Sequence, residues 1–418
     1  MKRRAPDPAS ARGKLAGPRD GSTHGSVPRW LHQLAGPLFV AAALSMLLPA
    51  VGRGADASPP SVDLGHIRLT DHGVTAPIRG GGRAELTLDP ELQRAAERLL
   101  ARAAPAQGAV VVIEARTGRI LTWAEYGARH PGDVLLKLEA PSASVFKIVT
   151  SVALIERTHA STAQRVCYRG GMHRIERDNL ERPRRGPGVR CTSFYRALGH
   201  SINAIFAQLA TRYLERDDLI VTGKRFGFNH PLPFDVPVEL GTLHVPYNDL
   251  AFARTSAGFV HTRLSTLGAA YLAYSVAAGG RIVRTHIVQS AGDYHAPARR
   301  EIVRRAFRLR TARLLTRMME VTVQSGTSVH AFTDESHRSY LPGVQVAGKT
   351  GTLKPTRRSP TTSWFTGFAP SRRPRVVVGV LLENGHVWRE KANEVARDVL
   401  RAYFAHHGHY RRVTDPLE

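Results

Sequence analysis

The chain has 418 residues, enough for one large catalytic domain or two smaller ones. Its 42% hydrophobic and 22% charged residues are typical of a globular protein and exclude wholesale disorder. The net charge of +25 suits binding to nucleic acid, or to anionic lipid and cell-wall polymer. Because the basic residues are spread along the chain without zinc-finger spacing or an RNP-like aromatic strand, we expect no nucleic-acid partner.

The N-terminal region has the pattern of an export signal. Residues 1–33, rich in Lys and Arg, predict a basic disordered leader, and residues 34–51 form an apolar run just long enough to cross a bilayer. Ala55-Asp56-Ala57 resembles a cleavage site. A cleaved signal peptide and a retained membrane anchor therefore both remain open, and either would place the rest of the chain in the cell envelope, on the periplasmic side of the inner membrane.

A composition rich in Gly, Pro, Ser and Asp predicts a linker over residues 52–84, with order beginning near Glu85. Asp89-Pro90 then predicts a helix start, with an N-cap followed by proline at the first helical position. Apolar residues keep helical spacing from residue 92 to 103, and Pro105 stops the helix. Residues 109–115 and 119–124 predict two strands joined by a turn.

Residues 140–330 are predicted to be mostly helical, with helices at 144–157, 201–213 and 264–278. Three strands follow at 344–352, 364–369 and 375–383, before a last amphipathic helix at 390–404. This order predicts one α+β domain over residues 85–405, in which N- and C-terminal helices flank an antiparallel sheet and a mostly helical subdomain is attached.

Residues 406–418, which include His406, His407 and His409, are predicted to form a frayed tail. We expect neither a metal site nor a cofactor. Cys167 and Cys191 lack a second pair that would complete a tetrahedral metal site. In an oxidising compartment they would close one loop and contribute about 3 kcal/mol; two unrelated buried thiols are the alternative.

Three short motifs carry the chemistry. The first is Ser144-Val145-Phe146-Lys147 at a helix start, where positions i and i+3 share one face, so the Lys147 amine can reach the Ser144 hydroxyl. Serine is a poor nucleophile until a neighbouring base takes its proton. A lysine can be that base only if burial or another cation lowers its pKa. Taken alone, the pattern also fits an N-cap serine before a surface lysine.

The second motif is Ser201-Ile202-Asn203, a hydroxyl and an amide two residues apart at a loop-to-helix junction. Ser201 could relay a proton to a leaving amine, and Asn203 could hold Lys147 and a substrate carbonyl. A simply capped helix is the alternative interpretation.

The third motif is Gly348-Lys349-Thr350-Gly351-Thr352 at the end of a predicted strand, which could pair with an extended peptide. Lys349 and the hydroxyls of Thr350 and Thr352 could bind a carboxylate, while Gly351 would leave room for close backbone approach. A phosphate-loop interpretation fails, because no Gly-x-x-x-x-Gly-Lys spacing is present.

The order and contexts of the motifs resemble the Ser-x-x-Lys, Ser-x-Asn and Lys-Thr-Gly set of penicillin-binding proteins and serine β-lactamases. The segments at 86–93, 109–124, 325–327 and 364–370 also look like those of penicillin-binding transpeptidase domains, so the likeness covers roughly residues 85–405. Nothing before residue 85 resembles a glycosyltransferase domain, and the pedestal of the long monofunctional enzymes is largely absent.

The resemblance implies a D,D-transpeptidase acting on D-Ala-D-Ala stem peptides of peptidoglycan and acylated by β-lactam antibiotics. Ser144 would be the nucleophile and Lys147 the base, with Ser201 and Asn203 assisting proton transfer. Lys349 and Thr350, beside Gly351, would position the substrate carboxylate. The backbone N–H groups of Ser144 and Thr352 would form the oxyanion hole. Other cell-wall synthesis proteins are conceivable partners.

Other activities remain open on the same scaffold. Attack by water would make the chain a D,D-carboxypeptidase, an endopeptidase or a β-lactamase. Against the β-lactamase, Ile202 replaces the aspartate of the Ser-Asp-Asn class, and Glu239 lies in no Glu-x-x-Leu-Asn string. The oxacillinase class has a hydrophobic residue where Asn203 stands. A non-catalytic penicillin-sensing domain is an alternative of another class, which the intact Ser144 and Lys147 disfavour.

Overall fold

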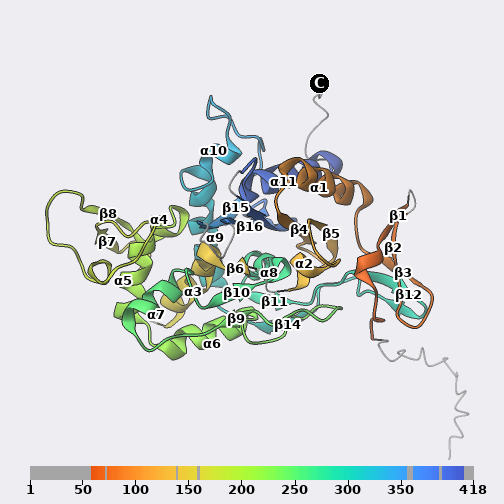
Figure 1. Ribbon diagram of the computed structural model, residues 1–418, viewed down its shortest axis with the longest axis horizontal. Coiled ribbons are helices and arrows are strands. Elements are labelled where there is room, and N and C mark those ends of the chain that lie inside the picture. Colours follow the sequence, from red (N-terminus) through yellow and green to blue (C-terminus); the bar gives the residue numbers. More distant parts are fainter. Residues whose placement is uncertain are drawn as a thin grey trace, which may run out of the picture. The chain divides into compact units, whose positions relative to one another are not determined.

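The computed structural model describes residues 58–70, 73–137, 140–157, 161–354, 361–385 and 388–408. At its centre lies a five-stranded antiparallel sheet with the strand order β15–β16–β17–β4–β5 (Figure 1). It combines an early hairpin, β4 (Gln107–Glu114) and β5 (Ile120–Tyr126), with three late strands, β15 (Ala347–Leu353), β16 (Thr361–Ala369) and β17 (Val376–Asn384). Because β17 pairs with β4, the sheet joins the two ends of the domain.

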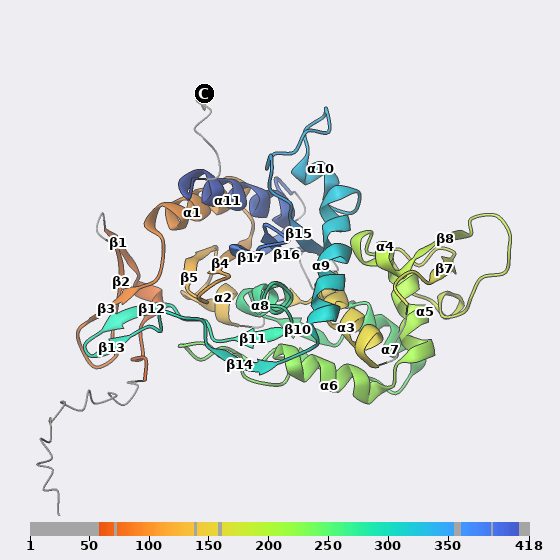
Figure 2. The same cartoon turned by 180° about the vertical axis from the view of Figure 1, so that it is seen from behind.

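Helices cover both faces of this sheet. α1 (Pro90–Ala103) and α11 (Ala392–His406) lie together on one side, and α8 (Thr266–Ala277) lies on the other (Figure 2). Strand β4 divides its side chains between two hydrophobic clusters: Val111 and Ile113 pack on the α8 side, Val110 and Val112 on the α1–α11 side. A strand buried on both faces needs this continuous apolar run, which is how its sequence reads.

Most of the remaining elements form the helical subdomain, whose short strands make one three-stranded sheet and two strand pairs. Its helices are α2 (Asp133–Leu136), η2 (Ala143–Phe146), α3 (Lys147–Arg157), η3 (Arg177–Asn179), α4 (Phe194–Gly199), α5 (Asn203–Tyr213), α6 (Arg216–Phe226), α7 (Asp249–Ser256), α9 (Leu309–Gln324) and α10 (Val329–Phe332). Its short strands are β6 (Ala140–Pro141), β7 (Arg165–Tyr168), β8 (Arg190–Ser193), β9 (Thr242–Leu243), β10 (Thr262–Leu264), β11 (Arg281–Val283) and β14 (Ile302–Arg305). The predicted α+β class, with helices flanking an antiparallel sheet, is confirmed.

The predicted linker at 52–84 is wrong for the residues from 58 onward. η1 (Leu64–His66), β1 (Arg68–Thr70), β2 (Gly73–Pro77) and β3 (Arg83–Leu86) occupy this segment, and β3 pairs with β12 (Val288–Ala291), which pairs with β13 (Tyr294–His295). Val74, Ala76 and Ala84 are buried in it. These apolar residues are small and isolated, and β3 has its outer partner β12 about 200 residues later, so local composition did not indicate the strands.

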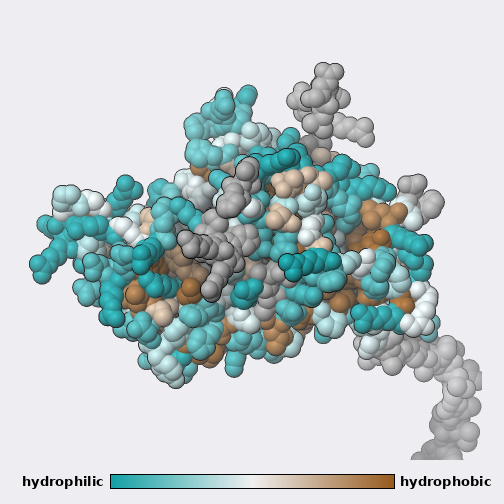
Figure 3. Space-filling view, viewed as in Figure 1, coloured by the Kyte–Doolittle hydropathy of each residue, from teal (hydrophilic) through white to brown (hydrophobic). Residues whose placement is uncertain are grey.

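Residues 1–57, which contain the predicted leader and apolar run, lie outside the described residues. Within the described ranges, none of the helices combines the length and the hydropathy needed to cross a bilayer. The face of the molecule in Figure 3 is mainly hydrophilic, with hydrophobic residues in small separate groups.

The predicted boundary of the C-terminal tail is also wrong for its first two residues. Helix α11 continues to His406, and His407 caps it. His406 Nδ1 lies 2.6 Å from Glu91 Oε2. This contact with α1 extends the helix beyond residue 404, and residues 409–418 lie outside the described ranges.

Gly379 lets α8 pack directly on β17, because a Cβ added there would lie 2.9 Å from Ala270 Cβ and 3.0 Å from Ala270 N. We expect Gly379→Ala to lower the free energy of unfolding by about 1–3 kcal/mol, as overpacking does. Urea denaturation followed by circular dichroism measures this loss. The matched control is Gly385→Ala, where the added methyl meets open space; equal stability of the two variants would contradict direct packing.

Candidate active site

Ser144 lies in η2, the tight turn that leads into helix α3. The preceding Ala143 has a φ of 49°, and the turn is held from the other side by the chain around residue 258. A Cβ at Gly258, where φ is +84°, would lie 1.8 Å from Ala143 O, so only glycine fits there. Ser142 Oγ also contacts Thr262 Oγ1 at 2.5 Å. The Ser144 turn is therefore fixed by packing, with its side chain partly exposed.

Lys147 lies one turn after Ser144 and is completely buried. Its Nζ lies 2.5 Å from Ser144 Oγ, 2.5 Å from Asn203 Oδ1 and 3.0 Å from Ala257 O. None of these three partners carries a negative charge. Burial, with a smaller effect from the charge of Lys349, lowers the pKa of Lys147 well below its ordinary value.

A neutral lysine amine has two N–H donors and one lone pair. In this form Lys147 can donate to Asn203 Oδ1 and Ala257 O while its lone pair accepts the hydroxyl proton of Ser144. The arrangement thus suits the uncharged amine, which is the form a general base requires.

Asn203 is the first residue of α5 and is itself held in place. Its Nδ2 donates to Met172 O, in the segment between β7 and β8. A disulfide between Cys167 and Cys191 joins these two strands, with the sulfurs 2.08 Å apart. The disulfide thereby closes the segment whose carbonyl accepts a hydrogen bond from Asn203 Nδ2. Asn203 Oδ1 is then left to accept a hydrogen bond from Lys147.

The third motif meets the second through Lys349. Its Nζ donates to Ser201 Oγ over 2.9 Å and to Thr350 O over 2.8 Å. Lys349 is completely buried, and burial lowers its pKa to about 7. From the sequence we expect Lys349 to bind a carboxylate; in the structure its amine contacts the partly exposed Ser201 hydroxyl from beneath.

Strand β15 is an edge strand of the central sheet, and its free edge passes the Ser144 turn. A Cβ at Gly351 would lie 3.3 Å from Ser144 N and 3.1 Å from Ala143 Cβ, which measures how closely the two backbones approach. Thr350 Oγ1 lies 2.5 Å from Thr327 Oγ1, and Thr352 is exposed. Hydroxyl groups therefore line the accessible side of the site, and the two lysines lie beneath them.

The sequence does not indicate the roles of Ala257, Met172 and Thr327. The first two act through backbone carbonyls, which no residue type marks in a sequence. Thr327 lies in the segment 325–327, which resembles the family, but the sequence does not show what it contacts; its backbone N–H donates to Gly199 O over 3.2 Å.

The sequence profile of the penicillin binding protein transpeptidase domain matches residues 108–404. The chain belongs to this family. The resemblance inferred from the three motifs is thus confirmed.

Relatives and solved structures of the family are similar to the chain over most of its length. Peptidoglycan D,D-transpeptidase PbpA of Mycobacterium tuberculosis is 28% identical over 351 residues, covering 73% of this chain and 68% of the relative. The imipenem acyl-enzyme complex of penicillin-binding protein A from M. tuberculosis is 26% identical, with a TM-score of 0.63 and coverage of 78% and 80%. The D,D-transpeptidase domain of a peptidoglycan glycosyltransferase from Eggerthella lenta is 25% identical, with a TM-score of 0.63 and coverage of 78% and 83%.

The pKa of Lys349 predicts a pH dependence of stability. An unfolded lysine titrates near 10.4 and the folded Lys349 at about 7, so between these values the unfolded chain binds the extra proton. Stability contributed by this group therefore rises with pH across the window, by up to about 1.4 kcal/mol per pH unit. We expect Lys349→Met to reduce this slope, measured by urea denaturation from pH 7 to 10. An unchanged slope would show that Lys349 keeps an ordinary pKa.

Proposed function

We propose that the chain is a peptidoglycan D,D-transpeptidase that forms an acyl-enzyme at Ser144 with D-Ala-D-Ala stem peptides and with β-lactams. Family membership and the names of its relatives support the reaction class. The observation that carries the assignment to Ser144 is the buried Lys147 amine 2.5 Å from its hydroxyl.

In acylation, neutral Lys147 takes the hydroxyl proton while Ser144 Oγ attacks the carbonyl carbon of the penultimate D-Ala. The carbonyl oxygen becomes an oxyanion, which the backbone N–H groups of Ser144 and Thr352 would stabilise by a few kcal/mol. The proximity of β15 to Ser144 N supports this pairing, since Gly351 lets the two backbones approach. Collapse breaks the C–N bond and leaves an ester on Ser144.

The departing amine needs a proton. Ser201 would deliver it; its hydroxyl accepts a hydrogen bond from Lys349 and remains partly exposed, which supports this role. Lys349 can in turn replace the proton, and its pKa of about 7 suits such exchange near neutral pH. Attack of an acceptor amine on the ester would then cross-link two peptides. Lys147 would return its proton to Ser144 Oγ, and the proton lost by the acceptor amine would pass to Ser201 and restore Lys349.

The substrate carboxylate would lie on the exposed hydroxyl side of the site. Thr350, Thr327 and Thr352 offer O–H donors there. Lys349 would contribute its positive charge from beneath rather than by direct contact, since the structure places its amine on Ser201. An extended stem peptide could pair with the free edge of β15.

Cell-wall peptides place the reaction in the cell envelope. Anchoring or secretion on the periplasmic side of the inner membrane is a proposal that rests on the apolar run at 34–51. Association with other cell-wall synthesis proteins is likewise proposed, because a transpeptidase acts on polymer that another enzyme supplies.

Ser144→Ala should abolish covalent labelling by penicillin, and Lys147→Met should slow it by about 10²–10⁴-fold, the usual contribution of a general base. Mass spectrometry of the intact chain and of its peptides detects the adduct and locates it. The control Ser336→Ala alters an exposed serine and should label normally. Circular dichroism checks that each variant is folded, and labelling of folded Ser144→Ala would refute the assignment.

The same assay with a D-Ala-D-Ala peptide and an amine acceptor separates the remaining activities. A transpeptidase gives cross-linked peptide, whereas a carboxypeptidase gives only the peptide shortened by D-Ala. Rapid release of hydrolysed penicillin would indicate a β-lactamase, and a folded wild-type chain that forms no adduct would indicate a sensor.

A further inference from the structure

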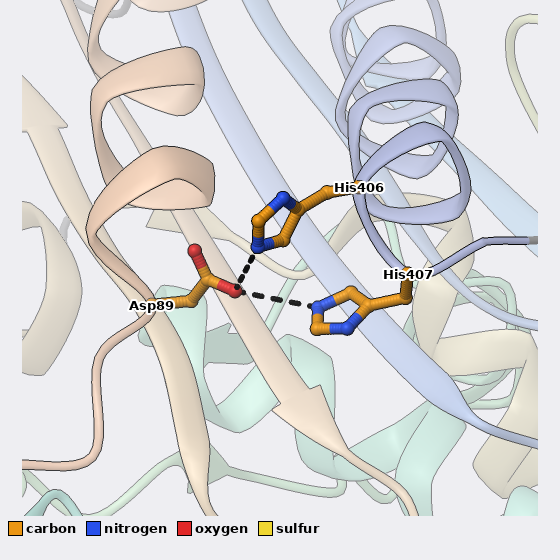
Figure 4. Close-up of side chains that lie close together, drawn as sticks. All are labelled: Asp89, His406 and His407. Carbon is orange, nitrogen blue, oxygen red and sulfur yellow. Dashed lines mark ion pairs between the residues drawn. The ribbon is translucent and has the colours of Figure 1, made fainter. Parts of the chain in front are cut away.

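Three side chains with metal-ligand atoms meet where the first and last helices of the domain join (Figure 4). Asp89 is the N-cap of α1, and His406 and His407 end α11. Asp89 Oδ2 lies 3.6 Å from His406 Nε2 and 3.3 Å from His407 Nε2. One ligand atom from each residue lies within 4.8 Å of the other two.

The surrounding contacts fix the orientation of these groups. Asp89 Oδ1 accepts the backbone N–H groups of Glu91 and Leu92, each over 3.0 Å, which leaves Oδ2 for another partner. His406 Nδ1 lies 2.6 Å from Glu91 Oε2, and the His407 ring lies against Tyr403, with ring centroids 4.5 Å apart. A metal-binding histidine commonly donates one ring N–H to a carboxylate and binds the ion through its other ring nitrogen. Glu91 and His406 have this arrangement.

The spacing of these atoms matches that of ligands around one small cation. In a tetrahedral site with bonds of 2.0–2.1 Å, neighbouring ligand atoms lie about 3.3 Å apart. The distances of 3.3 and 3.6 Å from Asp89 Oδ2 are close to this value.

We propose that Asp89, His406 and His407 bind one Zn²⁺ ion, with water as the fourth ligand and Glu91 as the positioning residue for His406. Two imidazole nitrogens and one carboxylate oxygen suit Zn²⁺, whereas Mg²⁺ and Ca²⁺ prefer oxygen ligands throughout. The ligands border a surface cavity of about 760 Å³, which gives an ion access. The same cavity is also lined by Arg94, Arg116, Arg119 and Arg375. Because their positive charge repels a cation, the ion must be held by direct bonds to its three ligands.

The position indicates a structural role. α1 and α11 pack together over the sheet face opposite the core cluster that contains the Ser144 turn. An ion held by both helices would clamp the beginning of the domain to its end. Because it would bind the folded chain and not the unfolded one, it would raise the midpoint of thermal unfolding. The rate of acylation at Ser144 should not change.

The test uses the full chain in detergent, without a polyhistidine tag, and titrates Zn²⁺ by calorimetry and by thermal unfolding. We expect one equivalent of Zn²⁺ to bind and to raise the unfolding temperature by a few degrees, while Mg²⁺ has no effect. Asp89→Asn keeps a good N-cap but lacks the carboxylate, so it should fold and bind Zn²⁺ at least tenfold more weakly. His407→Ala should do the same.

Glu91→Gln should retain the one-to-one stoichiometry with about tenfold lower affinity, the size of effect typical for groups that orient a metal ligand. His330→Ala, which removes an exposed histidine elsewhere, should bind as the wild type does. Absence of Zn²⁺ binding to the wild type would overturn the proposal. So would equal binding by Asp89→Asn, His407→Ala and the wild type, which would assign the ion to adventitious histidines.

Discussion

The buried amine of Lys147 is the group on which the rest of the site depends. A cation in this position would be desolvated without any anionic partner among its three contacts, Ser144 Oγ, Asn203 Oδ1 and Ala257 O. Desolvation therefore favours the neutral amine, and only that form can take the serine proton. The three polar partners also satisfy its hydrogen-bonding capacity, so burial of the amine does not leave it unpaired.

Each partner of Lys147 comes from a different part of the chain, and the fold holds each one separately. Asn203 depends on Met172, which lies in the segment closed by the Cys167–Cys191 disulfide. Ala257 precedes Gly258, whose missing side chain leaves room for the Ser144 turn. Strand β15 brings Lys349 to Ser201 from the central sheet. The geometry therefore belongs to the assembled domain rather than to any one motif.

Much of this arrangement could be predicted from the sequence, because its signals are local. The helix beginning at Asp89-Pro90, the apolar strand over 109–115 and the Ser-x-x-Lys turn each carry their own pattern, and the structure contains an element at each place. The strand at 83–86 could not be predicted, since it pairs with β12, far along the chain. The same applies to Ala257 and Met172, whose contributions come from the backbone, and to His406 and His407, whose contacts depend on how α11 meets α1.

A measurement of the charge state of Lys147 tests its proposed role as general base most directly. NMR of the chain labelled with ¹³C at the lysine ε-carbon can follow each amine with pH, and the signal absent from Lys147→Met identifies the residue. We expect the Lys147 amine to lose its proton at a pH well below the ordinary lysine value, because burial disfavours its charged form. A Lys147 signal that stays protonated until about pH 10, as a solvated lysine does, would contradict the proposed general base.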